Sequence, residues 1–271
     1  MKSANLLCWV LLIGCCLSCA EKPAPGKQVL IKEGFSNKVL DAYWLYLPAN
    51  YHPGKKWPLI MFLQGGDAGA SPNPNTVRDG GPFGYIRQPQ MNLPDSFIII
   101  NPHMRTGPRE RRQWFENANG LIQMINKTIQ ENNADPNRIY LTGQSRGGHG
   151  TWGVAKRYPA KFAALVPIAG ALGCKTNCEE IAKIPMWILH NDGDPVVKYE
   201  YPQTTVAFLE DQVGMRFLRT SDLAIDQDML DSKAIFTTFA SDQHGGAGAK
   251  AYSSTVLYEW LLDQSRTSKK R

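Results

Sequence analysis

The sequence has no apolar run of the ~20 residues that a transmembrane helix needs, and it shows no internal repeat. It also lacks a strong excess of one charge, since 30 Lys and Arg face 24 Asp and Glu and the cations are dispersed along the chain. A nucleic-acid-binding function, which usually needs a basic stripe, is therefore not indicated. The hydrophobic share of 43% is too high for a disordered chain, and 271 residues suit one large domain.

Metal and phosphate motifs are missing as well. The glycine-rich segment 143–150 lacks the G-x-x-x-x-G-K-[ST] pattern of a phosphate-binding loop. No cluster of His, Cys, Asp or Glu has metal-ligand spacing. We therefore expect neither a metal nor an organic cofactor.

Cysteine is scarce outside residues 1–20, which hold four of the six. This segment has a lysine near its start, an apolar run at 6–13 and small residues before a Pro-rich stretch, which is the order of a secretory signal. Three processing sites compete: lipid attachment at Cys15, lipid attachment at Cys19, and cleavage after Ala20. The pattern predicts an exported protein that is periplasmic, extracellular or attached to the membrane through an N-terminal lipid.

The rest of the chain alternates between strand-like and helix-like segments over residues 39–265, and the strand-like ones are apolar on both faces. This combination predicts an α/β fold with a mostly parallel central sheet and helices on both faces. Residues 21–38 are expected to form a linker and the start of the fold, and 266–271 a solvated basic tail. Strands are expected at 39–47, 57–63, 97–100, 138–142, 163–168, 186–190 and 235–239, helices at 117–133, 148–157, 201–213 and 252–262, a long loop at 65–90 and a turn at 135–137.

A G-x-S-x-G motif, Gly143 to Gly147, lies between an expected strand and an expected helix. A serine on such a sharp strand-to-helix turn projects its hydroxyl from the top of the sheet, and the two glycines let neighbouring backbone pass closely. The N-terminus of the following helix favours negative charge that develops at the serine. Ser145 is therefore the candidate nucleophile, and a plain glycine-rich turn is the alternative.

A serine hydroxyl needs a base to attack a carbonyl, and in this fold class the partners follow in the order Ser, acid, His. His244 is the one histidine that lies after both Ser145 and a plausible acid. Asp192 and Asp194 both follow the preceding strand. Asp194 is favoured because Pro195 stiffens the chain after it, whereas Asp192 is typical of a turn residue.

Stabilisation of a tetrahedral oxyanion requires two backbone N–H groups. One is expected from Arg146, the residue after the nucleophile. The other is expected from Gly66, with Gly65 as the second choice, because both follow the apolar strand 57–63 and a glycine lets the main chain approach a substrate.

Five segments of the sequence carry a family resemblance: residues 80–82, 135–152, 157–164, 166–167 and 194–197. They resemble secreted α/β-hydrolase carboxylesterases of the predicted-peptidase, feruloyl-esterase-like and polyhydroxybutyrate-depolymerase-like groups. The resemblance covers about residues 39–262 and implies that Ser145, Asp194 and His244 form a catalytic triad. The sequence departs from the family pattern at Gln64, where His is usual, at Arg146, where Met is usual, and at His190-Asn191, where His-Gly is usual.

The resulting expectation is an exported serine esterase that forms an acyl-enzyme on a small acyl, carbohydrate or phenolic ester. Its substrate is a small molecule or an ester linked to a polysaccharide. A serine peptidase of the same fold and a catalytically inactive carbohydrate-binding surface protein are the alternatives. Neither the acyl group nor the oligomeric state follows from the sequence.

Cys174 and Cys178 should form a disulfide in the exported protein, because removal of the leader leaves them as the only cysteines and an oxidising compartment favours their pairing. Mass spectrometry without reduction tests this, and two free, alkylatable thiols would contradict it. A bridge over so short a loop removes little chain entropy, so reduction should lower stability only slightly.

Overall fold

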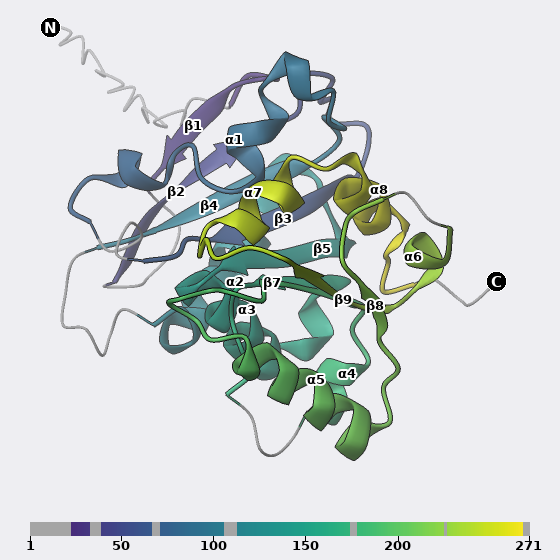
Figure 1. Ribbon diagram of the computed structural model, residues 1–271. Helices are drawn as coiled ribbons and strands as arrows, with labels where there is room; N and C mark the ends of the chain where they lie inside the picture. Colours follow the sequence, from purple (N-terminus) through teal and green to yellow (C-terminus); the bar gives the residue numbers. More distant parts are fainter. Residues whose placement is uncertain are drawn as a thin grey trace, which may run out of the picture.

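The computed structural model describes residues 23–32, 39–66, 71–105, 113–173, 178–224 and 227–267. Within these ranges nine strands form one sheet in the order β1-β2-β4-β3-β5-β6-β7-β9-β8 (Figure 1). β1 and β2 are antiparallel to their neighbours, and every pairing from β4 to β8 across the sheet is parallel. This is the mostly parallel α/β-hydrolase sheet that the sequence predicts. The predicted leader lies outside the described residues.

The elements follow the expected alternation of strand and helix. The strands are β1 Gln28–Ile31, β2 Leu40–Tyr46, β3 Trp57–Leu63, β4 Ile98–Met104, β5 Ala134–Gln144, β6 Ala164–Ile168, β7 Met186–Asn191, β8 Leu218–Thr220 and β9 Ala234–Phe239. The α-helices are α1 Pro82–Ile86, α2 Ala118–Asn132, α3 Arg146–Arg157, α4 Glu179–Ala182, α5 Glu200–Val213, α6 Gln227–Asp231, α7 Gly246–Tyr252 and α8 Thr255–Asp263. Short 3₁₀ turns occupy Pro74–Val77, Pro89–Met91, Phe115–Asn117 and Pro159–Lys161.

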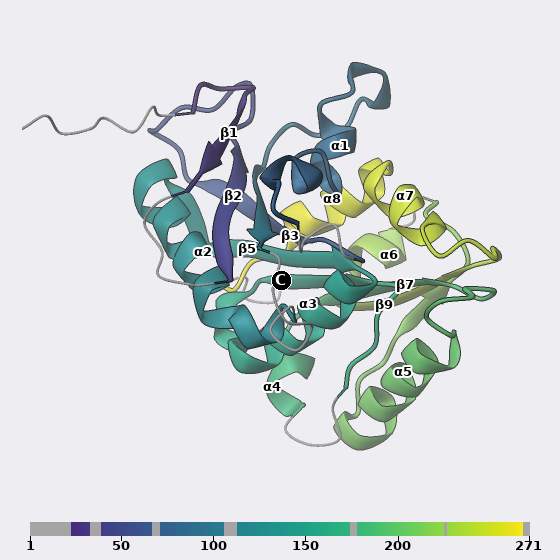
Figure 2. The same ribbon diagram turned by 90° about the vertical axis from the view of Figure 1, so that its left-hand side faces the viewer.

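Helices cover both faces of the sheet (Figure 2). Buried side chains of α2, α3, α4 and α5 belong to the hydrophobic cluster on one face, and those of α1, α6, α7 and α8 to the cluster on the other. The central strands β3, β4, β6 and β7 are buried along their whole length. The continuous apolar strand-like segments of the sequence arise from this position.

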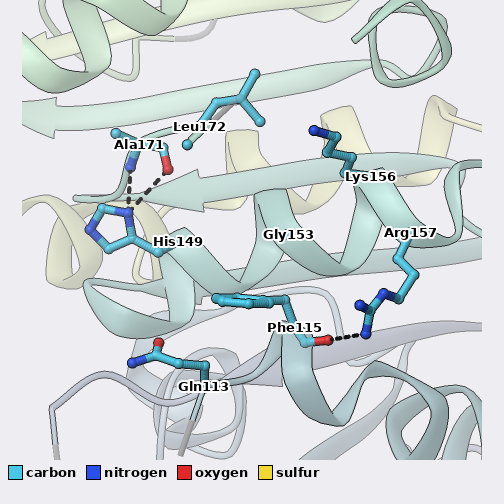
Figure 3. A pocket seen from close by; sticks show the side chains of 9 residues that line it. Gln113, Phe115, His149, Gly153, Lys156, Arg157, Ala171 and Leu172 are labelled. Atoms are coloured by element: carbon cyan, nitrogen blue, oxygen red, sulfur yellow. Dashed lines mark hydrogen bonds between the residues drawn. The ribbon is translucent and has the colours of Figure 1, made fainter. Parts of the chain in front are cut away.

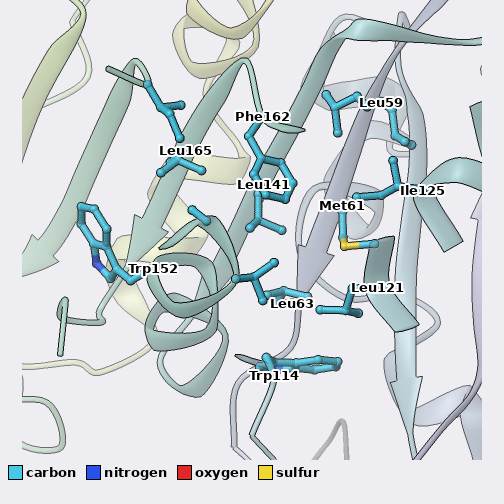
Figure 4. Packing of buried hydrophobic residues seen from close by; sticks show 14 of the residues in the cluster. Leu59, Met61, Leu63, Trp114, Leu121, Ile125, Leu141, Trp152, Phe162 and Leu165 are labelled. Atoms are coloured by element: carbon cyan, nitrogen blue, oxygen red, sulfur yellow. The ribbon is translucent and has the colours of Figure 1, made fainter. Parts of the chain in front are cut away.

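β3 shows how one strand supplies both clusters. Leu59, Met61 and Leu63 belong to the cluster under α2 and α3, where Figure 4 shows them beside side chains of those helices. Ile60 and Phe62 belong to the opposite cluster. Because successive side chains of a strand point to opposite faces, all seven residues of β3 are buried.

The strand expected to stop at Asn101-Pro102 instead continues to Met104. β4 pairs in parallel with β3 only as far as Ile100, and beyond that point it pairs with β2 alone. A proline, which has no N–H to donate, is tolerated where one side of a strand has no partner. The expected stop was therefore wrong, because the proline lies where β4 has become a one-sided strand.

The turn expected at 135–137 was also wrong in part. This segment lies inside β5, where the register with β3 shifts between the pairs Trp57–Ala134 and Leu59–Ile139. The turn chemistry itself is present, since the Asn137 N–H donates to the Asp135 side chain at 2.9 Å. The sequence signal marks a bulge within the strand rather than its start.

Other boundaries differ from the expectation near the ends of elements. The helix after the serine begins at Arg146 rather than at 148, and the C-terminal helix expected at 252–262 is α8, which begins at Thr255. The preceding helix α7 was not predicted. The expected loop 65–90 contains α1, and β1 lies in the segment expected to be linker and start of the fold. Among the described residues, no helix combines the length and apolarity needed to cross a bilayer.

Gly147 allows α3 to lie against the end of β3, because a Cβ at this position would lie 1.8 Å from the Leu63 carbonyl oxygen. Gly147→Ala should therefore lower the free energy of unfolding by at least about 3 kcal/mol through overpacking against backbone. Gly173→Ala is the matched control, since its Cβ meets nothing within 4 Å. Urea denaturation of both variants measures the difference, and equal stabilities would contradict this account of the packing.

Candidate active site

Ser145 occupies the turn between β5 and α3 in a strained conformation. Its φ of 57° and ψ of −118° place a non-glycine residue where side chains rarely lie. Two backbone hydrogen bonds hold it there: its N–H donates to the Ile168 carbonyl at 2.9 Å, and its carbonyl accepts from the His149 N–H at 3.0 Å. Neighbouring strand and helix thus fix the serine at the carboxyl end of β5.

The two motif glycines are required by crowding around this turn. A Cβ on Gly143 would lie 2.4 Å from the Gly147 carbonyl oxygen, and one on Gly147 would collide with β3. Arg146 is the first residue of α3, so its backbone N–H belongs to the helix N-terminus. The structure therefore places Gly143, Ser145, Arg146 and Gly147 in the strand-turn-helix arrangement that the motif predicts.

Asp194 and His244 are in direct contact although 50 residues separate them in sequence. The His244 Nδ1 lies 2.7 Å from Asp194 Oδ2 and 3.0 Å from Oδ1. The Asp194 side chain is fully buried, whereas that of His244 remains 24% exposed. A buried carboxylate therefore faces the inner nitrogen of a ring whose other side is accessible.

Backbone donors also hold the Asp194 carboxylate. The N–H groups of Val196 and Val197 donate to its Oδ1 at 2.8 and 3.0 Å. Burial alone raises the pKa of Asp194, but the hydrogen bonds from His244, Val197 and Val196 outweigh it and leave the pKa below the ordinary value. Asp194 is therefore ionised at neutral pH.

Asp192, the other candidate acid, has a different role. Its Oδ1 accepts from the Ser241 N–H at 3.1 Å on the protein surface. The Gly193 N–H donates to the Ser241 carbonyl at 3.1 Å, and the Asn191 side-chain amide donates to the Gln243 carbonyl. These contacts form a clasp between segments 191–193 and 241–243, and it continues the pairing of β7 with β9 beyond their ends. The clasp brings the loops of Asp194 and His244 together.

His190 is fully buried beneath the acid. Its Nε2 donates to the Val197 carbonyl at 2.8 Å and lies 3.7 Å from Asp194 Oδ2. Burial lowers the pKa of His190, and the Val197 and Asp194 contacts oppose this only in part. The ring is therefore neutral, as expected for a buried packing residue, and it supports the chain segment that holds Asp194.

Gln144 connects the serine turn to the histidine loop. Its side-chain amide donates to the His244 carbonyl at 3.3 Å, and a Cβ on Gly248 of α7 would lie 2.3 Å from its Oε1. Among the described residues, Ser145 Oγ and the His244 ring do not form a hydrogen bond with each other. Gln144 therefore holds the histidine loop next to the serine turn, but the hydrogen bond between nucleophile and base is not formed.

Gly65 and Gly66 follow β3 beside the serine. A Cβ on Gly65 would lie 2.8 Å from the Gln144 carbonyl oxygen and 3.2 Å from the Ser145 Cβ. Gly66 has open space around it and a φ of +52°, a left-handed conformation that favours glycine. Both predicted glycines therefore follow β3 at the end of the sheet that carries the serine. Gly65 is required there by its close contact with the serine turn, and Gly66 by its left-handed backbone conformation.

Gln64 turns its side chain away from the serine. Its amide donates to the Val77 carbonyl at 3.3 Å and packs over Gly80. Its backbone carbonyl accepts from the Trp114 indole at 2.9 Å. Trp114 and Gln144 were not predicted as supports of the site, and of these two only Gln144, beside the serine in the sequence, offered a signal. His190, which ends an apolar strand, is the packing and hydrogen-bonding residue that its position predicts.

Cys178 is buried before α4, and its predicted partner Cys174 lies outside the described residues, so the disulfide stays a prediction. Among the described residues, no group of three or more His, Cys, Asp or Glu side chains is placed to hold a metal ion.

No protein-family model matches the chain. Acetylxylan esterase A of Emericella nidulans is 42% identical over 165 residues, which covers 56% of this chain and 50% of that protein. Dipeptidyl-peptidase 5 of Porphyromonas gingivalis is 26% identical over 136 residues, which covers 47% of this chain and 19% of that protein. A thermostable esterase of known structure aligns with a TM-score of 0.68 at 25% identity, over 89% of this chain and 63% of that one.

The fold and these comparisons define an α/β-hydrolase that resembles esterases, as the nucleophile region predicts. Two of these three similar proteins are named as esterases and the third as a peptidase. The chain matches only half or less of the length of the two curated relatives above, so their substrates are not transferred to it.

Removal of His190 should flatten the dependence of stability on pH. The unfolded chain binds a proton at an ordinary histidine pKa of about 6.5, whereas the folded protein holds His190 neutral to lower pH. The contribution of His190 to the free energy of unfolding is therefore complete above about pH 6.5 and falls as the pH drops toward the lower, folded pKa.

His190→Gln keeps a donor for Val197 but cannot titrate. Urea denaturation at pH 7.5 and pH 5 should show a smaller loss of stability in the variant than in the wild type. An identical loss in both proteins would show that His190 is not held neutral by the fold.

Proposed function

We propose that the protein is an exported serine esterase that hydrolyses carboxylic esters through Ser145, His244 and Asp194. The observation that carries the proposal is the contact of buried Asp194 with His244 Nδ1 at 2.7 Å, on the same edge of the sheet as a strained Ser145. An ionised carboxylate at Nδ1 fixes the imidazole tautomer, so that Nε2 is left to accept a proton. This is the arrangement that a serine nucleophile needs.

The reaction begins when His244 removes the proton from Ser145 as the hydroxyl attacks the ester carbonyl. The negative charge of Asp194 stabilises the imidazolium that forms. The imidazolium then gives its proton to the departing alcohol, which leaves an acyl group on Ser145. Water activated by His244 hydrolyses this acyl-enzyme and regenerates the free serine.

The tetrahedral oxyanion is assigned to the backbone N–H groups of Arg146 and Gly66. Arg146 begins α3, so its N–H lies at the positive end of the helix dipole. Gly66 follows the end of β3 with open space around it, which leaves room for a substrate oxygen. No step of this reaction calls for a metal or an organic cofactor.

The substrate is proposed to be a small acyl ester, free or linked to a polysaccharide. The resemblance to acetylxylan esterase A supports this class. A peptidase is the second candidate, because dipeptidyl-peptidase 5 is also a relative. Export, through the leader of residues 1–20 with either cleavage or lipid attachment, and the Cys174–Cys178 disulfide complete the proposal.

The activity is tested with a panel of nitrophenyl acyl esters, acetylated and feruloylated sugars, and aminoacyl amides. The account predicts turnover of short-chain esters and little turnover of amides. A preference for amides would support the peptidase, and no turnover by folded protein would support a non-catalytic binding module.

Asp194→Asn should lower turnover of a simple acetyl ester by about 10⁴, because asparagine supplies no negative charge and can stabilise the wrong imidazole tautomer. Asp192→Asn is the matched control. Its side chain accepts one surface hydrogen bond from Ser241, which an asparagine oxygen can also accept, so its effect should be small.

Turnover at neutral pH is measured for both variants, with circular dichroism as the check on folding. A larger loss at Asp192 than at Asp194 would reverse the assignment. Small losses at both would show that neither aspartate orients His244.

A further inference from the structure

A groove of about 600 Å³ runs along the outer face of α3, which is the helix that begins at the nucleophile (Figure 3). His149 and Gln113 line one end of the groove, Phe115 and Leu172 its walls, and Lys156 with Arg157 the other end. This volume lies within the range of small-molecule sites, which is about 300–1,000 Å³. The catalytic residues proposed above do not line it.

One end of the groove lies a single helical turn from the serine, at His149 of α3. His149 lies one helical turn after Ser145, and its N–H donates to the Ser145 carbonyl. From His149 to Lys156 the helix rises about 10 Å. A chain-like ligand that entered at the serine would therefore pass His149 first and reach the cationic end about two turns further along α3.

One wall is an aromatic surface held in place by the helix. Phe115 is 36% exposed, and it packs so closely on α3 that a Cβ on Gly153 would lie 2.6 Å from the Phe115 Cβ. Arg157 donates to the Phe115 carbonyl at 2.9 Å. The preceding residue, Trp114, is buried and bonded to the end of β3, so the position of the phenyl ring is set before any ligand binds.

The opposite wall, formed by Ala171 and Leu172, is also held by hydrogen bonds. The Leu172 N–H donates to the Thr205 hydroxyl of α5 at 3.1 Å, and the Ala171 N–H donates to His149 Nδ1 at 3.1 Å. Both walls are thus attached to helices that pack on the central sheet. A pre-formed groove loses little conformational entropy when a ligand binds.

Polar, apolar and cationic side chains follow one another along the groove. Gln113 and His149 offer polar side chains at the end where α3 begins, Phe115 and Leu172 offer apolar surface in the middle, and two cations lie at the other end. Lys156 and Arg157 are exposed, and neither forms an ion pair with a carboxylate of the described residues. Among the residues that the structure describes, no acidic side chain lines the groove.

We propose that this groove is a subsite for the sugar chain of an esterified acidic polysaccharide, which deepens and rests on the proposed function. A sugar ring has an apolar face that packs against Phe115 and hydroxyl groups that bond to Gln113 and His149. A uronate carboxylate, separated from the ester by at least one sugar ring, pairs with Lys156 and Arg157. The groove thus binds the alcohol side of the ester while Ser145 attacks the acyl group.

The test compares kcat/KM for three substrates: nitrophenyl acetate, an acetylated neutral xylo-oligosaccharide, and the same oligosaccharide carrying a glucuronate. Phe115→Ala should lower kcat/KM for both oligosaccharides about tenfold relative to nitrophenyl acetate, because it removes apolar contact area. Phe115→Trp keeps an aromatic surface and should restore most of the loss. Equal losses on all three substrates, or no loss on any, would overturn the proposal.

Lys156→Gln tests the cationic end. It should lower kcat/KM about threefold for the glucuronate-bearing substrate relative to the neutral one, because exposed charge pairs are weak, and salt should reduce the difference by screening them. Lys233→Gln, an exposed lysine outside the groove, is the matched control and should change neither. Equal effects on the charged and neutral substrates would overturn the assignment of the carboxylate.

Calorimetric binding of the deacetylated acidic oligosaccharide separates this proposal from the proposed function. Binding to the wild type that Phe115→Ala weakens would support the groove even if no ester were hydrolysed. Ester hydrolysis without any such binding would leave the esterase proposal intact and overturn the sugar subsite.

Discussion

The pairing of β7 with β9 is the interaction on which the site depends. Hydrogen bonds between the two strands continue past their ends into the clasp of segments 191–193 and 241–243. Because the clasp fixes both loops, the buried carboxylate of Asp194 meets the His244 ring. The energetic cost of burying a carboxylate is offset by three donors, namely His244 and the N–H groups of Val196 and Val197.

Close packing at the ends of β3 and β5 is the second constraint. Gly65 and Gly147 let three backbone segments approach the serine within distances that a Cβ would forbid. The strain at Ser145 persists because β6 and α3 each contribute a hydrogen bond to it. The same helix then carries the outer groove, so the proposed chemistry and the proposed sugar subsite share one rigid support.

Most of the fold follows from patterns that are local in the sequence. The apolar segment Trp57–Leu63 was predicted with its observed bounds, because a strand buried on both faces needs a continuous apolar run. Pro102 was misinterpreted because its tolerance depends on where β4 leaves β3, which is a property of the sheet. Asp194 could be favoured over Asp192 because its neighbour Pro195 is a local signal. The supporting residues Gln144 and Trp114 could not be predicted in this way, because each acts through a partner 50 to 100 residues away in the sequence.

Labelling with a fluorophosphonate probe, followed by mass-spectrometric mapping of the modified peptide, shows directly whether Ser145 is an activated nucleophile. We expect one label per molecule, on Ser145, and much slower labelling of a folded His244→Ala variant because the serine then lacks its base. A label on another residue, or a folded wild-type protein that takes up no label, would contradict this assignment.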